Sequence, residues 1–314
     1  MLKTLFGGLS RAGSSARLSV LIFHRVLPEV DPLFPDEVDA LRFDLICGWL
    51  KSWFNVLPLD KAVAHLRAGT LPASAACITF DDGYADNFHI ALPILQRHGL
   101  TATFFISTGF LDGGRMWNDT IIETVRARAG TTLDGTNSDL GHYRLDSIPQ
   151  SQQVIGEIIS KVKYLEIAER INITESLARA ASVDLPKNLM MTSAEVKKLF
   201  QAGMQIGAHT VSHPILARLG DDEAKQEIKD SKVFLEKLLG ERVGLFAYPN
   251  GKPGEDYSPQ TVDVVRKLDF DAAVSTSWGA SSSGDDLFQI RRFTPWDKSK
   301  GKFGLRLLAN LRAS

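Results

Sequence analysis

The sequence predicts a parallel α/β fold that closes into a barrel and carries one helical insertion after its fourth strand. Short apolar runs alternate with helical segments along most of the chain, and a single long stretch interrupts this alternation. Near-continuous apolar runs are typical of strands that are buried on both faces of a parallel sheet. Strand–helix units repeated about seven or eight times indicate a barrel.

Eight short apolar runs are the candidate strands. The first, LSVLIF at 18–23, follows a basic N-terminal segment, as the apolar core of a signal peptide can. It spans only six residues and continues into His-Arg without a small-residue cleavage site, so we interpret it as a strand. The other strands are expected at 54–57, 76–80, 101–107, 204–208, 243–248, 270–275 and 288–292.

Capping signals mark the starts of three helices between these strands. TSAE at 192–195 is a capping box, and SPQ at 258–260 places a proline in the first helical turn after a serine cap. Asp221 or Asp222 is expected to cap the long helix after the strand at 204–208.

Residues 112–190 break the alternation and contain no predicted strand. Helices are expected at 117–129, 150–165 and 166–181, with a polar linker at 130–142. We therefore expect a single domain over 1–314 with 112–190 inserted into it. Loops after barrel strands lie on the catalytic face, so the insertion is either a lid or substrate wall, or a packing accessory without substrate contact.

The overall composition excludes several classes of partner. A formal net charge of -1 over 314 residues predicts no nucleic-acid partner. Cys47 and Cys77 lie in apolar runs and are expected to be buried thiols without a disulfide. No run approaches the roughly 18 apolar residues of a membrane span, so the cytoplasm is the expected location. The basic, amphipathic C-terminal segment is expected to pack on the domain or to make weak peripheral membrane contact.

Two adjacent carboxylates, Asp81 and Asp82, follow the predicted strand at 76–80. Taken alone, one of them would cap the next helix and the other would face solvent. His209 and His213 lie four residues apart after another predicted strand, a spacing that suits one metal ion. Two histidines and one carboxylate leave coordination positions open for water and substrate, which indicates a catalytic divalent metal.

Two further candidates lie at the ends of predicted strands. Asn250 stands in a Pro-Asn-Gly turn whose backbone N–H groups can hold a developing oxyanion, unless the segment is only a tight turn. His24 ends the first strand, and a histidine there can act as a general acid near neutral pH. The alternative is a rim histidine with no role.

The motifs TFDDG at 79–83, HTVSHP at 209–214 and FAYPNG at 246–251 together resemble the polysaccharide deacetylase superfamily, the NodB-type carbohydrate esterases. The resemblance covers about residues 18–297 except the insertion. It implies a distorted (β/α)7-type barrel and a metal-dependent hydrolase. It also implies that Asp81 is the general base and that Asp82 and the two histidines bind the metal, with Zn²⁺ expected and Co²⁺, Ni²⁺ or Mn²⁺ as alternatives.

The chain departs from the common family pattern at two places. No arginine precedes Pro249 closely, and no histidine follows His213. Both departures fit a subgroup that resembles poly-N-acetylglucosamine deacetylases, in which the acid histidine comes from an N-terminal strand. The resemblance then assigns the general acid to His24 and the arginine that orients the base to Arg292, with Arg291 as the alternative.

The expected activity is removal of N-acetyl groups from the amino sugars of a poly- or oligosaccharide in cell-surface glycan biosynthesis. An O-acetyl ester deacetylase is a close alternative, because an ester leaving group needs less protonation than an amine. A non-catalytic glycan-binding protein on the same fold is a second alternative. Loss of the base or of a metal ligand would mark such a protein, and this sequence keeps all four residues.

Overall fold

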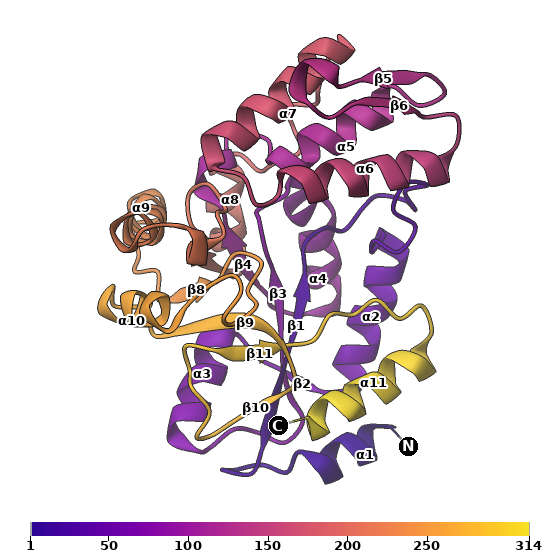
Figure 1. Cartoon of the computed structure of the whole chain (residues 1–314). Coiled ribbons are helices and arrows are strands. Elements are labelled where there is room, and N and C mark those ends of the chain that lie inside the picture. The colour runs from indigo at the N-terminus through magenta and orange to yellow at the C-terminus, as the bar shows by residue number, and fades with distance from the viewer. Residues whose placement is uncertain (1, 314) are drawn as a thin grey trace. The chain divides into compact units, whose positions relative to one another are not determined.

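The computed structural model describes residues 2–313, without the side chain of Asn137, and has the expected α/β architecture (Figure 1). The chain forms two compact units. The first comprises Met1–Glu29, Asp36–Asp112 and Met191–Ser314, and the second comprises Val30–Pro35 and Gly113–Met190.

A nearly closed sheet organises the first unit, and each predicted strand is present in it. Its strands are β1 (Arg17–Phe23), β2 (Asn55–Val56), β3 (Ala75–Phe80), β4 (Thr103–Ile106), β7 (Gln205–Ala208), β8 (Leu245–Ala247), β9 (Ala272–Trp278), β10 (Ser281–Ser282) and β11 (Ile290–Arg292). The order is β10-β1-β3-β4-β7-β8-β9-β11, with β2 beside β3. All neighbours are parallel except β10 on β1.

The two ends of the sheet meet just after β11. Phe293 bridges Leu21 of β1, its N–H donates to Val20 O at 2.7 Å, and its carbonyl accepts from Ile22 N–H at 3.0 Å. These bonds satisfy backbone groups that an open sheet edge would leave exposed. The sheet is therefore a distorted barrel, which confirms the predicted fold class.

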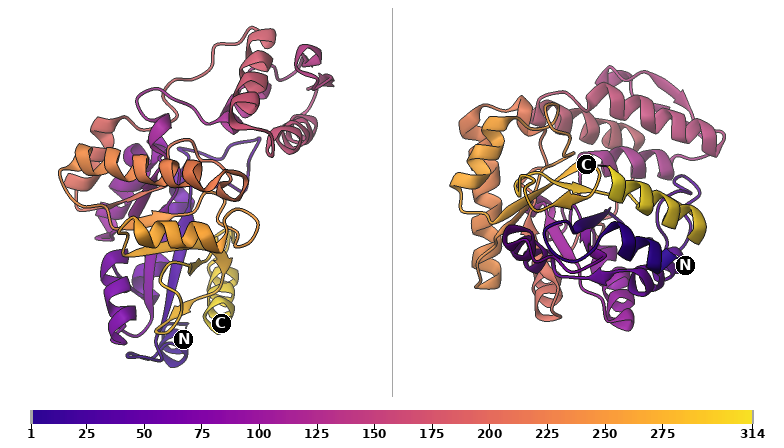
Figure 2. Two further views of the ribbon diagram at one scale, coloured as in Figure 1. Left: turned by 60° about the vertical axis from the view of Figure 1, so that its left-hand side comes forward. Right: turned by 90° about the horizontal axis from the view of Figure 1, so that it is seen from below.

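Within the described residues 2–313, eight α-helices of the first unit surround the strands (Figure 2). They are α1 (Leu2–Leu9), α2 (Ala40–Trp53), α3 (Leu59–Ala68), α4 (Leu92–His98), α8 (Ser193–Gln201), α9 (Asp221–Leu239), α10 (Pro259–Lys267) and α11 (Lys300–Arg312). The Arg17 side chain at the start of β1 donates to Leu311 O in α11 at 2.6 Å. The two terminal helices thus lie at the end of the barrel where the strands begin.

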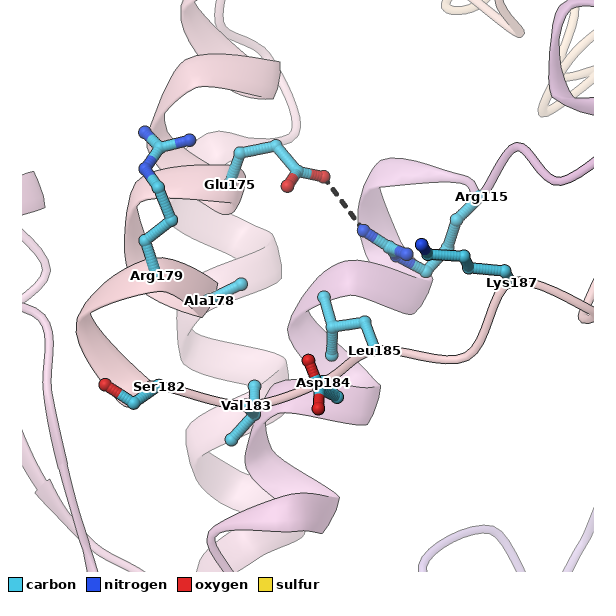
Figure 3. A pocket seen from close by; sticks show the side chains of 9 residues that line it. All are labelled: Arg115, Glu175, Ala178, Arg179, Ser182, Val183, Asp184, Leu185 and Lys187. Atoms are coloured by element: carbon cyan, nitrogen blue, oxygen red, sulfur yellow. Dashed lines mark hydrogen bonds and ion pairs between the residues drawn. The ribbon is translucent and has the colours of Figure 1, made fainter.

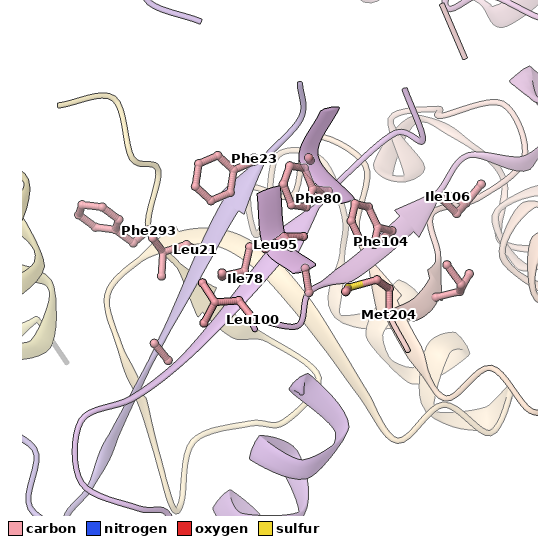
Figure 4. Packing of buried hydrophobic residues seen from close by; sticks show 14 of the residues in the cluster. Leu21, Phe23, Ile78, Phe80, Leu95, Leu100, Phe104, Ile106, Met204 and Phe293 are labelled. Carbon is pink, nitrogen blue, oxygen red and sulfur yellow. The ribbon is translucent and has the colours of Figure 1, made fainter. Parts of the chain in front are cut away.

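Alternating side chains along the strands build two cores. The larger core lies between the outer face of the sheet and the helices, where Phe23, Phe80 and Phe104 stack with ring centroids 5.3 and 4.8 Å apart (Figure 4). The smaller core includes Cys77 on the opposite, inner face. Cys47 and Cys77 are buried free thiols, as predicted.

The helix caps confirm two sequence predictions and correct a third. Both the Thr192 and the Ser258 capping boxes are present. The N-cap of α9, however, is Gly220, so the prediction that Asp221 or Asp222 caps this helix was wrong. Both carboxylates lie in the first turn instead, where the helix dipole favours negative charge.

The C-terminal helix α11 packs on the barrel through its apolar face. Phe303, Leu307 and Leu311 are fully or almost fully buried, whereas Leu305 on the other face is exposed. Within residues 2–313, no helix combines the length and the apolar character that crossing a membrane requires.

The second unit is mainly helical, as predicted, with α5 (Trp117–Ala127), α6 (Ile148–Val162) and α7 (Ile167–Ala181). A hairpin of β5 (Thr132–Asp134) and β6 (His142–Arg144) also forms within and just after the expected linker, so the prediction of a strand-free segment was wrong. Each hairpin strand has three residues with only the middle side chain buried, which is too short an alternation to recognise in the sequence.

A polar pocket of about 400 Å³ lies within the second unit (Figure 3). Arg115 on its wall donates to Glu175 at 2.9 Å, and further lining side chains carry both signs of charge. The unit has its own apolar core, and an ion pair from Arg126 to Asp31 ties the short segment Val30–Pro35 to it. The role of the insertion as a lid or substrate wall stays a prediction.

Candidate active site

The two adjacent aspartates reach the same site because the backbone turns between them. Asp81 continues the alternation of Cys77 and Thr79, so its side chain belongs to the inner face of the barrel. Simple alternation would send Asp82 to the outer face. Asp82 instead has φ +76°, in the left-handed region, and Gly83 follows with φ +94°. Strained backbone of this kind concentrates at functional sites.

Asp82 converges with the two histidines of the HTVSHP segment. Its Oδ1 lies 3.5 Å from His209 Nε2 and 3.4 Å from His213 Nε2, and one ligand atom from each residue lies within 4.8 Å of the others. Asp82 Oδ1 is buried and has no hydrogen-bond donor among residues 2–313. A buried acceptor without a donor is costly, and one oxygen with two imidazole nitrogens fits a divalent cation. The three residues therefore form a candidate metal site.

Hydrogen bonds outside the cluster orient both imidazoles. His209 Nδ1 lies 2.7 Å from the carbonyl of Ala247, and a proton assigned to that nitrogen leaves Nε2 with its lone pair toward Asp82. His213 has φ +51°, and its N–H donates to Thr210 Oγ1 at 3.2 Å. Both arrangements pre-form the donor set that the sequence predicts.

The electrostatics of the cluster follow from burial and close opposite charges. Burial lowers the pKa of His213 to about 4, which keeps this imidazole neutral as a metal ligand must be. Burial also opposes the charged form of His209, but the adjacent carboxylates of Asp82 and Asp81 outweigh this and raise the pKa of His209. For Asp82, the histidines overcome the effect of burial and hold the pKa of the carboxyl well below its usual range.

Asp81 is paired with a buried arginine. Arg292 Nη1 and Nη2 each donate to one carboxylate oxygen of Asp81 at 2.8 Å, and the two side chains are 0% and 3% exposed, respectively. Arg292 Nε donates to Ser275 O at 2.7 Å. Burial would raise the pKa of Asp81, but Arg292 outweighs it and the pKa is lowered. Arg291, the alternative partner, extends beside Gly279 instead.

The remaining two candidates border the same cluster. His24 follows β1 directly, and a proton on its ring would lower the pKa values of both Asp81 and Asp82, so it lies within electrostatic reach of them. Asn250 has φ +57°, and its carbonyl accepts from Thr276 Oγ1 at 2.9 Å. Among residues 2–313, no acceptor pairs with the Asn250 backbone N–H, so this donor is available to a substrate.

Glu227 on α9 stabilises the site, and the sequence did not predict this role. Its carboxylate accepts from the N–H groups of Val211 and Ser212 at 2.8 and 2.9 Å and from Ser212 Oγ at 2.7 Å. These bonds hold the loop between the two histidines. A glutamate inside an amphipathic helix carries no motif, so no signal in a single sequence could have identified this contact.

A barrel whose strand ends carry an Asp-His-His cluster beside a buried acid belongs to the class of metal-dependent hydrolases. The profile of the family described as "Polysaccharide deacetylase" matches residues 68–134 and 142–273, which is more than half of the chain. The chain therefore belongs to the polysaccharide deacetylase family, whose members are metal-dependent carbohydrate deacetylases.

Individual relatives agree with this assignment. YxkH of Bacillus subtilis, whose name places it among polysaccharide deacetylases, is 21% identical over 279 residues, covering 88% of this chain and 71% of YxkH. The fold resembles Streptococcus pyogenes deacetylase PplD in complex with acetate, with TM-score 0.62, 20% identity and coverage of 94% and 98% of the two chains. It also resembles IcaB from Ammonifex degensii, with TM-score 0.61, 18% identity and coverage of 97% and 99%.

Proposed function

We propose that this protein removes acetyl groups from N-acetylated amino sugars of a cell-surface poly- or oligosaccharide. The observation that carries the proposal is the Arg292–Asp81 pair beside the Asp82–His209–His213 cluster. A buried carboxylate paired with arginine, beside a donor set suited to Zn²⁺, supports the assignment of Asp81 as the base, and we propose Zn²⁺ as the resident metal. The cytoplasmic location and any weak membrane contact stay predictions.

Asp82, His209 and His213 would hold the metal. When bound there, the ion supplies Lewis acidity that polarises the acetyl carbonyl and makes a water molecule more acidic. Asp81 takes a proton from the attacking water as the new C–O bond forms. The Asn250 N–H donates to the developing oxyanion.

His24 completes the proposed reaction at the leaving group. Its imidazolium gives a proton to the amine nitrogen as the C–N bond breaks, because an amine is a poor leaving group until it is protonated. The products are acetate and the free amino sugar. In the resting site, Arg292 keeps Asp81 ionised so that it can accept the proton.

Acetate release from N-acetylated glycans, measured together with the metal content of the protein, tests the function. The wild-type protein should contain about one divalent ion per chain and release acetate from N-acetylglucosamine oligomers. His213→Ala should lose both the metal and the activity, since it removes one of three ligands. A wild-type protein that holds metal but releases no acetate from any glycan would refute the proposed activity.

Substitution of His24 separates amide from ester chemistry. His24→Ala should lower deacetylation of an N-acetylglucosamine oligomer by about 10²- to 10⁴-fold, because the amine then leaves without a proton donor. Hydrolysis of 4-nitrophenyl acetate should change little, since nitrophenolate leaves without protonation. Rates on the two substrates check this expectation. Equal losses on both would contradict the acid role.

A further inference from the structure

We propose that Asp86 and Asn87 are positioning residues that hold the backbone of His24 and so direct its imidazole toward the scissile amide. This inference rests on the proposed function. His24 is the first residue after β1, and its side chain is exposed to solvent. Among residues 2–313, no group hydrogen-bonds to its ring. The backbone that carries the imidazole sets its Cα–Cβ bond and therefore the region that the ring can reach.

Two adjacent side chains contact three consecutive residues of that segment, two of them at backbone atoms and one at its side chain. Asn87 Nδ2 donates to the His24 carbonyl at 2.9 Å. Asp86 Oδ1 accepts from the Val26 N–H at 3.0 Å, and Asp86 Oδ2 accepts from Arg25 Nε at 2.8 Å. The backbone is thus held at His24 and at Val26, and the Arg25 side chain between them pairs with the same carboxylate.

Asp86 and Asn87 differ from residues that only support a surface loop in their burial and in their local backbone geometry. Asn87 is 0% exposed and Asp86 is 8% exposed. Burial raises the pKa of the Asp86 carboxyl, and the Arg25 guanidinium opposes this only in part. Asn87 begins a π-helical turn, Asn87–Ala91, and such turns are rare and frequent at functional sites. A helix cap at the surface would need neither the burial nor the irregular turn.

The same short segment also carries the proposed base. Asp81 and Asp82 precede Asp86 by only a few residues, between β3 and α4. Gly83 O accepts from Met191 N–H at 2.9 Å, which further restrains the segment. One piece of backbone therefore sets the positions of the base, of a metal ligand and, through Asn87, of His24. Misplacing a catalytic group by about 1 Å can lower a rate about 100-fold, so this link has catalytic consequences.

A double-mutant cycle between Asn87 and His24 tests the proposal. Asn87→Ala should lower deacetylation of an N-acetylglucosamine oligomer by about 10- to 100-fold and leave 4-nitrophenyl acetate hydrolysis within about threefold of wild type. In the His24→Ala background, Asn87→Ala should cause no further loss, because its effect passes through the imidazole. Asn310→Ala, which removes another fully buried amide in α11, is the matched control and should change neither rate.

A purely structural role gives a different result. If Asn87→Ala lowers amide and ester hydrolysis together, or lowers the rate equally with and without His24, the positioning role is wrong. Asp86→Asn, which keeps an acceptor for Val26 but loses the ion pair with Arg25, provides a second variant should Asn87→Ala fold poorly. It should show the same dependence on His24.

An NMR measurement separates this inference from the proposed function. The ring C–H signal of His24 can be identified among those of seven histidines by its absence in His24→Ala. In Asn87→Ala its chemical shift should change, because the backbone that carries the ring is no longer held at the His24 carbonyl. A wild-type protein without activity on glycans would refute the function alone, whereas an unchanged His24 signal in Asn87→Ala would refute the positioning role.

Discussion

Asp81→Asn should abolish most of the acetate release while the protein keeps its metal. Asparagine cannot accept the proton of the attacking water, so we expect kcat to fall by about 10²- to 10⁴-fold. The metal should remain, because Asp82 and the two histidines supply the cluster without Asp81. Acetate release and metal analysis on the same preparation check both halves of this expectation.

The paired measurements also define what would contradict the base assignment. Activity within a few-fold of wild type would exclude Asp81 as the base. Loss of metal in Asp81→Asn would instead mean that the two carboxylates do not have separate roles. His213→Ala, which should lose the metal, is the matched control, so the two variants should differ in metal content and agree in low activity.

Arg292→Met should destabilise the fold by about 3–5 kcal/mol, because it leaves the buried carboxylate of Asp81 without its partner. The Arg292 and Asp81 side chains are 0% and 3% exposed, so water cannot compensate the charge that remains. Urea denaturation should show the loss as a lower free energy of unfolding. The pKa of Asp81 should rise at the same time, which would reduce the fraction of ionised base.

Two companion variants make this stability prediction specific. Arg291→Met changes the neighbouring arginine, which does not contact Asp81, and should cost about 1 kcal/mol or less. The double variant Asp81→Asn with Arg292→Met should be more stable than the sum of the single losses predicts, because the uncompensated charge is gone. Equal losses for Arg291→Met and Arg292→Met would contradict the importance of the buried pair.

Several elements could be predicted from the sequence because their signals are local. The strand at 76–80 and the capping box at 192–195 depend on neighbouring residues alone, and both are present. The cap of α9 and the small hairpin were missed for a related reason. Their sequence signals are weak or ambiguous, and the surrounding structure decides which residue takes the cap or pairs across the hairpin.

The sequence by itself determined the family, the barrel and the residue types of the candidate site, because these follow from short motifs and from apolar periodicity. Only the tertiary structure decided that Asp82 turns to meet the histidines and that Arg292, not Arg291, pairs with Asp81. The first depends on a left-handed φ, and the second on how β11 aligns with β3 across the closed sheet. Both are set by contacts between segments far apart in the chain, which no local pattern encodes.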